Sequence, residues 1–308
     1  MTPTAATATR TAGVTRGFAA IAEGQVHYRE AGASRSNGTG ENPAAQADAL
    51  PLVMLHASPG SARLLEPLIG ALGRHRHVIA TDTLGNGDSC APALAADGGP
   101  PSIAYFADAH VRALDALGVA AFDLYGSHTG ANIACEIAIA HPARVRRLIL
   151  DGVSLYDADE RADMLLHYAP GVKVDAMGSQ LHWIWQFVRD TYLFWPWYKH
   201  DAAHARSVGL PSPDDLHDKV VEVLKAARTY HLSYRAAIGY DKSERLPLVK
   251  VPTLLACART DMLHVYFDRV RALMPEAMPT TTAGTSTPHA LADTADRFEA
   301  FLAAPPPR

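Results

Sequence analysis

The sequence has few cysteines, no long apolar run and little net charge, and each absence excludes a class of protein. Cys90, Cys135 and Cys257 are widely spaced and odd in number, which argues against a disulfide framework and indicates reduced thiols in a cytoplasmic protein. No apolar run approaches the ~20 residues of a membrane span, so we expect no membrane partner. The formal net charge of −4 gives no strong field, so we expect no nucleic-acid partner either.

The first residues also lack the continuous apolar stretch of a secretory signal. Residues 1–17 are rich in Thr and Ala with scattered Arg and no acid, so we expect a disordered tail there. An organellar transit peptide is the alternative on composition. What the chain does have is 48% apolar and 19% charged residues, which is typical of a globular protein with an ample core.

Strand and helix patterns alternate along most of the chain. Residues 18–21 and 26–30 are two alternating apolar segments and predict an antiparallel hairpin. A polar loop over residues 33–49 follows, and we expect it to be mobile. After it, short apolar strands alternate with helical spacing, which predicts a parallel sheet with helices on both faces. The predicted strands are residues 52–55, 78–80, 122–125, 148–150, 253–256 and 280–282, and the predicted helices are 63–73, 105–117, 129–141, 265–273 and 291–302.

One long interruption separates the strand at 148–150 from the strand at 253–256. This interruption shows no strand pattern and contains all four tryptophans. We interpret it as a helical insertion over the carboxyl ends of the strands, where open α/β folds bind ligands.

The segment between the strand at 122–125 and the next helix carries the main chemical signal. A residue on a tight strand-to-helix turn needs small neighbours two positions away on each side, because the backbones crowd there. Only His128 has glycines at that spacing, Gly126 and Gly130, whereas centring the turn on Ser127 would crowd Tyr125. His128 is therefore predicted at the apex of the turn.

Several motifs along the chain resemble those of the α/β-hydrolase superfamily. The turn around His128 resembles its catalytic elbow, residues 56–61 its oxyanion loop with Ala57 in place of the usual glycine, and residues 82–89 the next strand-end loop. Asp261 then matches the acid position and His289 the general-base histidine. The departure is the histidine at the nucleophile position, where the family usually has serine.

The resemblance implies an α/β fold of the α/β-hydrolase type, with a mostly parallel eight-stranded sheet flanked by helices. It implies a core domain over residues 18–152 and 249–304 and a helical cap over 153–248. His289 would then act as the general base and Asp261 would hold it, while His128 orients water or substrate. The backbone N–H groups of Ser58 and Thr129 would form the oxyanion hole. We expect Trp183, Trp185, Phe187 and Trp195 to contribute to an apolar or aromatic substrate pocket.

Several alternatives stay open from the sequence. His128 could be a nitrogen nucleophile, or it could mark an elbow that has lost catalysis. Ser127 could be a displaced nucleophile, and Asp151 or Asp157 could supply the acid in place of Asp261. His128, His289 and Asp261 could together offer ligands to a divalent ion, but the fold's chemistry needs none, so we expect no metal and no cofactor.

The function predicted from these features is action on a small apolar or aromatic carbonyl compound. The bond cleaved would be an ester, lactone, thioester or activated carbon–carbon bond, by His-Asp base catalysis. A non-hydrolytic lyase, decarboxylase, isomerase or cofactor-independent oxygenase is the first alternative, because such reactions need a base and an oxyanion site but no serine. A ligand-binding protein without activity is the second. The expected partner is a small-molecule substrate, and a homodimer is compatible with the sequence.

Overall fold

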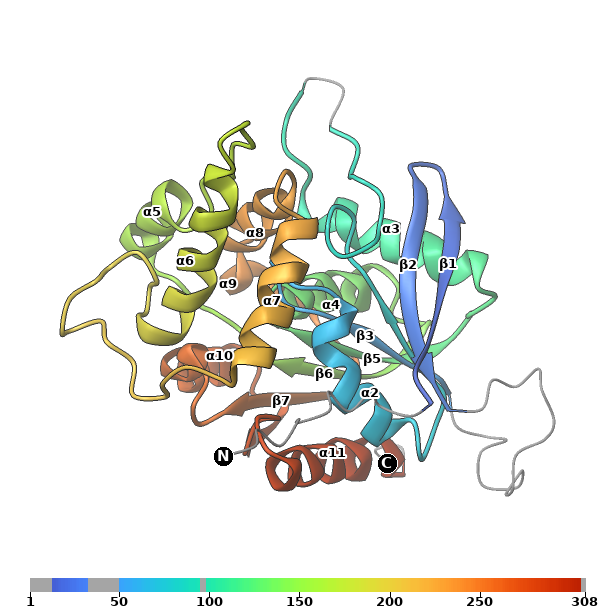
Figure 1. Ribbon diagram of the computed structural model, residues 1–308. Coiled ribbons are helices and arrows are strands. Elements are labelled where there is room, and N and C mark those ends of the chain that lie inside the picture. Colours follow the sequence, from blue (N-terminus) through green and yellow to red (C-terminus); the bar gives the residue numbers. More distant parts are fainter. Residues whose placement is uncertain (1–12, 33–49, 95–97, 306–308) are drawn as a thin grey trace, which may run out of the picture.

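An eight-stranded sheet forms the centre of the molecule (Figure 1), with the strand order β1-β2-β4-β3-β5-β6-β7-β8. The computed structural model describes residues 13–32, 50–94 and 98–305 of the 308-residue chain. β1 and β2 form the predicted antiparallel hairpin, β2 also pairs antiparallel with β4, and every pair from β4 to β8 is parallel. The strands are β1 (Thr15–Ile21), β2 (Gly24–Ala31), β3 (Leu52–Leu55), β4 (Val78–Thr81), β5 (Phe122–Ser127), β6 (Val145–Asp151), β7 (Thr253–Ala258) and β8 (Met278–Thr282).

Helices cover both faces of this sheet, as the alternating pattern predicted. Along β3, Val53 and Leu55 belong to the core on one face, together with residues of α3 and α4. Leu52 and Met54 point to the opposite face and pack in the core shared with α2 and α11. This alternation follows from the two-residue period of a strand, and both faces are buried because each is covered. The helices of this part are η1 (Ala62–Leu65), α2 (Glu66–Leu72), α3 (Ile103–Ala116), α4 (Thr129–Ala140), η3 (Met262–Tyr266), α10 (Phe267–Leu273) and α11 (Pro288–Ala303).

The segment between β6 and β7 is helical and contains no strand, as predicted for residues 153–248. In Figure 1 its helices gather on one side of the sheet, beyond the edge at which the parallel strands end. One isolated bridge joins Phe194 and Ala205 within it. We call residues 153–248 the inserted segment. Its helices are α5 (Ala158–His167), α6 (Ser179–Leu193), α7 (Pro213–Lys225), α8 (Tyr230–Gly239), α9 (Lys242–Arg245) and η2 (Leu246–Leu248).

Several predicted boundaries differ from the structure, and three of these differences have a clear local cause or form. β1 begins at Thr15, inside the predicted tail of residues 1–17, because Thr15, Arg16 and Gly17 pair with β2. The helix predicted from residue 63 begins as a 3₁₀ turn and becomes α-helical only at Glu66. α11 begins at Pro288 rather than at residue 291, since Thr287 caps it by accepting the Ala290 N–H.

The predicted tail and polar loop, and the expected absence of a membrane span, compare with the structure as follows. Residues 1–12 and the predicted mobile loop, 33–49, lie outside the described residues. Among the helices of the described ranges, none is long and apolar enough to cross a membrane.

Candidate active site

The turn between β5 and α4 places His128 at its apex. His128 has φ 51° and ψ −107°, and among the described non-glycine residues it alone has a positive φ. Its backbone N–H donates to the Asp151 carbonyl at the end of the neighbouring strand, 3.0 Å away. A non-glycine residue held in this region indicates a conformation that the surrounding structure imposes.

The two flanking glycines explain why the turn can form. A Cβ on Gly126 would lie 2.2 Å from the Gly130 carbonyl oxygen, and a Cβ on Gly130 would lie 2.2 Å from the Leu55 carbonyl oxygen. Both obstacles are backbone atoms, which cannot rotate away as a side chain would. The sequence argument that placed His128 rather than Ser127 at the apex therefore matches the geometry.

The His128 imidazole is paired with Asp261, which follows β7. His128 Nε2 lies 2.7 Å from Asp261 Oδ2, and the two side chains are 28% and 16% exposed. Burial lowers the pKa of His128, but the charge of the Asp261 carboxylate and its hydrogen bond outweigh burial, so the pKa is raised. Asp261 in turn has a lowered pKa, because attraction to His128 and the Leu263 N–H bond overcome the effect of burial.

A second carboxyl group, Asp151, stands at the end of β6 beside this pair. Its Oδ2 accepts a hydrogen bond from the Tyr125 hydroxyl at 2.9 Å. Burial and the nearby negative charge of Asp261 raise the pKa of Asp151 to about 6. Sequence reasoning offered Asp151 as an alternative acid; the hydrogen bond from His128 goes to Asp261 instead.

The predicted oxyanion donors lie on either side of the apex in the fold. Thr129 is the first residue of α4, so its N–H belongs to the helix turn that has no intrahelical acceptor. Among the described residues, neither the Thr129 N–H nor the Ser58 N–H has a hydrogen-bond partner. Ser58 is anchored through its hydroxyl, which lies 2.8 Å from the Ser233 hydroxyl of α8.

The His128 ring faces a small cavity, which we call the His128 pocket. One side comes from β5–α4 and the loop after β7, and the other from the inserted segment. Its volume is about 40 Å³, well below the ~300–1,000 Å³ of typical ligand pockets, so a ring-sized substrate requires the surrounding side chains to move apart. The lining residues are His128, Thr129, Asn132, Ser154, Tyr156, Tyr168, Trp195, Tyr234, Ala237, Ile238, Met262 and Leu263.

Solved structures share this architecture over nearly the whole chain. A bromoperoxidase from Bacillus anthracis superposes with a TM-score of 0.68 at 17% identity, covering 94% of this chain and 100% of that chain. An enol-lactonase from Burkholderia xenovorans LB400 gives a TM-score of 0.64 at 17% identity, covering 94% and 100%. The family model described as alpha/beta hydrolase fold matches residues 51–191, which include the elbow. The chain therefore has the α/β-hydrolase fold.

Curated relatives of this chain are hydrolases, and they support the interpretation of the chain as a hydrolase. A protein of Azorhizobium caulinodans named as a carbamate hydrolase, RutD, is 28% identical over 239 residues, covering 74% of this chain and 79% of the relative. A 2-hydroxymuconate semialdehyde hydrolase of a Pseudomonas species is 43% identical over 108 residues, which covers 33% of this chain and 36% of that enzyme.

The general-base histidine expected for an α/β-hydrolase makes no hydrogen bond to Asp261 in the described part of the chain. His289 lies in the first turn of α11 with an exposed side chain, and Asp293 on the same helix interacts with it electrostatically. The helix begins at Pro288 because Thr287 caps it, so His289 is a helix residue rather than a loop residue. The acid predicted to hold His289, Asp261, is hydrogen-bonded to His128 instead.

The four aromatic residues predicted to bind substrate separate into different environments. Trp195 lines the His128 pocket. Phe187 is buried in a cluster of the inserted segment, and Trp183 stacks on it with ring centroids 5.2 Å apart. Trp185 is 41% exposed and does not line the pocket. The tyrosines of the pocket were missed, because a tyrosine gives no sequence signal that separates a pocket wall from a core.

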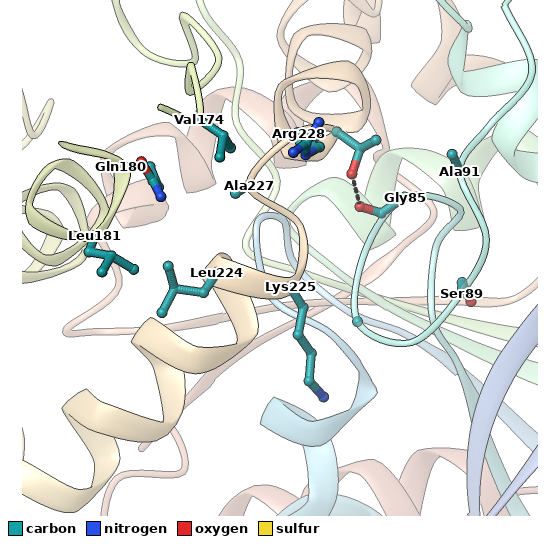
Figure 2. A pocket seen from close by; sticks show the side chains of 12 residues that line it. Gly85, Ser89, Ala91, Val174, Gln180, Leu181, Leu224, Lys225, Ala227 and Arg228 are labelled. Carbon is teal, nitrogen blue, oxygen red and sulfur yellow. Dashed lines mark hydrogen bonds between the residues drawn. The ribbon is translucent and has the colours of Figure 1, made fainter. Parts of the chain in front are cut away.

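Two cavities that share no lining residue with the His128 pocket are larger than it, and a third, of about 500 Å³, adjoins it at Tyr156 and Trp195. One, of about 210 Å³, lies against the other side of the His128–Asp261 pair and is lined by Ser127, Asp151 and Asp261 among others. Ser127 therefore faces a different cavity from His128. Figure 2 shows the other, of about 410 Å³, between α6, α7 and the loop after β4, where the Thr229 hydroxyl donates to the Gly85 carbonyl.

His56 and Asp82, near the predicted oxyanion loop, make hydrogen bonds that hold neighbouring backbone segments in place. His56 is fully buried, and its Nε2 accepts the Thr83 N–H at 2.9 Å. Within the described ranges, one group with metal-ligand spacing consists of His27, Asp82 and Asp88. Asp82 already accepts hydrogen bonds from the Ala62 and Asp88 N–H groups and contacts His27 at 2.8 Å, so its carboxylate is occupied by the fold.

Proposed function

We propose that this α/β-hydrolase cleaves a small apolar or aromatic carbonyl compound by activating water with a His128–Asp261 dyad. The observation that carries the proposal is the 2.7 Å contact between His128 Nε2 and Asp261 Oδ2, on a ring that faces an aromatic pocket. The carbonyl compound would be an ester, a lactone, a thioester or a compound with an activated carbon–carbon bond. In this proposal His128 takes over the base role that sequence analysis gave to His289.

Each component has a defined role in the proposed mechanism. Asp261 accepts the Nε2–H of neutral His128, which fixes the ring and leaves Nδ1 with a lone pair. Nδ1 takes a proton from a water molecule as the water oxygen attacks the carbonyl carbon. The N–H groups of Ser58 and Thr129 hold the oxyanion that forms. Its collapse releases the leaving group, which receives the proton from Nδ1.

Direct attack by Nδ1 is the alternative use of the same dyad. It would form an acyl-imidazole and release the leaving group before water enters. Rapid mixing with an aryl ester separates the two routes, because the covalent route gives a burst of the phenol product and the general-base route gives none.

The relatives support a carbonyl substrate without defining it. Their names specify a carbamate in one case and a semialdehyde in the other. The imidazole at the apex also suits proton transfer without hydrolysis, which is the second candidate. Reaction in ¹⁸O-labelled water distinguishes them, since only hydrolysis places the label in the product.

The test of the proposed function is turnover of a panel of aryl esters, aryl carbamates, thioesters and lactones by wild-type and variant protein. His128→Gln should lose about 10²- to 10⁴-fold in kcat/KM, the usual contribution of a general base. His289→Gln is the matched control and should retain wild-type activity, because its side chain is exposed on α11. Full activity in His128→Gln, or absence of any turnover by the wild-type protein, would overturn the proposal.

A further inference from the structure

We propose that Asn132 recognises the substrate, and that its side-chain amide binds an amide or carbamate group on an uncharged aromatic compound. The inference rests on the proposed function in one respect, which is that the substrate enters the His128 pocket. It adds a recognition residue and a substrate class that the dyad alone does not define.

The position of Asn132 places its amide beside the reacting group. Asn132 lies near the beginning of α4, four residues after His128, which is the residue that precedes this helix. Both residues line the His128 pocket. A substrate in this pocket can therefore contact both Asn132 and His128.

Asn132 is almost fully buried, and its side-chain amide has no hydrogen-bond partner among the described residues. The residue is 3% exposed and lines the pocket, and its backbone N–H donates to the His128 carbonyl 3.3 Å away. Buried amides are nearly always hydrogen-bonded, because leaving them unpaired costs folding free energy. An unpaired amide that faces a pocket at the reactive residue therefore points to a ligand.

The other walls of the pocket restrict that ligand to an uncharged aromatic compound. Four rings line it, those of Tyr156, Tyr168, Trp195 and Tyr234. Apart from His128, none of its described lining residues is acidic or basic. The charge of a protonated His128 is balanced by Asp261 at 2.7 Å. A carboxylate on the substrate would thus be buried without a counter-charge, which is unfavourable.

The donors and acceptor of Asn132 then select the polar group. An asparagine side chain offers one carbonyl acceptor and two N–H donors. An amide or carbamate presents a C=O and an N–H side by side and can satisfy both at once. A ketone of the same shape can accept from Asn132, but it leaves the Asn132 carbonyl oxygen unpaired.

The experiment is calorimetric titration of wild-type protein with three unreactive ligands of nearly equal size: benzamide, acetophenone and benzoate. Benzamide should bind about 10-fold more tightly than acetophenone, the effect of one additional hydrogen bond in a buried site. Benzoate should bind most weakly. In Asn132→Leu, which keeps the side-chain volume but removes the amide, benzamide and acetophenone should bind equally.

Gln180→Leu is the matched control, because it makes the same change from amide to leucine outside the His128 pocket. It should preserve the wild-type preference for benzamide. Equal binding of benzamide and acetophenone to the wild-type protein would overturn the inference, as would an unchanged preference in Asn132→Leu or tightest binding of benzoate. The wild-type comparison keeps the test decisive if Asn132→Leu does not fold.

Binding and turnover fail independently. If benzamide selectivity depends on Asn132 but His128→Gln keeps full activity, the proposed mechanism is wrong and the recognition role stands. If His128→Gln abolishes turnover but the ligands bind alike, the recognition role is wrong and the mechanism stands.

Discussion

Replacing Asp261 by Asn tests the dyad more directly than removal of His128 does. The substitution keeps the shape of the side chain but removes the charge that lies 2.7 Å from His128 Nε2. An amide can also donate to Nε2, which would favour the tautomer with its proton on Nδ1 and so remove the lone pair needed for base catalysis. Both the charge and the orientation of the proton are therefore lost in one step.

The expected loss in kcat/KM can be bounded from the geometry. A hydrogen bond to a charged group contributes about 1.5–3 kcal/mol, and each 1.36 kcal/mol is about 10-fold in rate. Loss of this hydrogen bond alone therefore predicts about 10- to 150-fold slower turnover. A wrong tautomer raises the loss toward the ~10⁴-fold known for an asparagine in the acid position of a catalytic triad.

The pH profile gives a second, independent result for Asp261→Asn. His128 acts as a base only when unprotonated, so wild-type kcat/KM should rise with pH through its raised pKa, above the ordinary 6.5. Without the Asp261 carboxylate, burial becomes the main influence on that pKa and lowers it. The rising limb should therefore move to lower pH in the variant. A loss smaller than about 3-fold with an unmoved limb would refute the assignment of His128 as general base.

Three further predictions concern residues around the dyad. Asp151→Asn should stabilise the fold above pH 6, because the pKa of Asp151 is raised from 3.8 to about 6 and its ionisation opposes folding over that interval. The free energy of urea unfolding should increase by up to about 3 kcal/mol at pH 7.5, and this gain should disappear below pH 3.8. Equal gains at both pH values would contradict the prediction. Gly152→Ala should lower activity about 10-fold or more, because the new Cβ would lie 2.6 Å from His128 Cδ2. It should also lower the free energy of unfolding by about 1–2 kcal/mol, because residue 152 has φ +68°. Unchanged kcat in a folded variant would contradict the contact with His128. His289→Gln should change steady-state activity less than about 2-fold. A large loss of activity would show that His289 takes part in catalysis.

Much of the fold could be predicted because its signals are local. The strand patterns depend on short apolar runs such as residues 52–55 and 122–125, which need burial on both faces of a parallel sheet. The elbow depends on the crowding that Gly126 and Gly130 avoid, and that crowding can be argued from spacing alone. The apex position of His128 followed from the same argument.

The partner of His128 could not be predicted in the same way. Chain order and family resemblance assigned Asp261 to His289, whereas in the structure Asp261 is hydrogen-bonded to His128. His289 lies in the first turn of α11, which begins at Pro288 after the Thr287 cap. Caps shift a helix start by a few residues, and such a shift decides whether a histidine stands in the loop or on the helix surface.

The pocket walls also depend on tertiary packing rather than on pattern. Of the four predicted aromatic residues, only Trp195 lines the His128 pocket. Trp183 and Phe187 stack on each other within the inserted segment, and nothing in their sequence context distinguishes the two uses. Asn132 did carry a usable signal, because it lies one helical turn after the apex residue.

The pairing of His128 with Asp261 has a consequence for how such an enzyme could be changed into a serine hydrolase. One imidazole occupies the apex and also satisfies the acid, so a serine introduced at residue 128 would face a buried carboxylate with no base between them. His289, on the surface of α11, is not placed to supply one. Conversion would therefore need both a serine at the apex and a second histidine beside Asp261. The serine alone would leave the site without a base, and the histidine alone would leave it without a serine nucleophile. In this chain, therefore, a serine at residue 128 alone would not create a serine hydrolase.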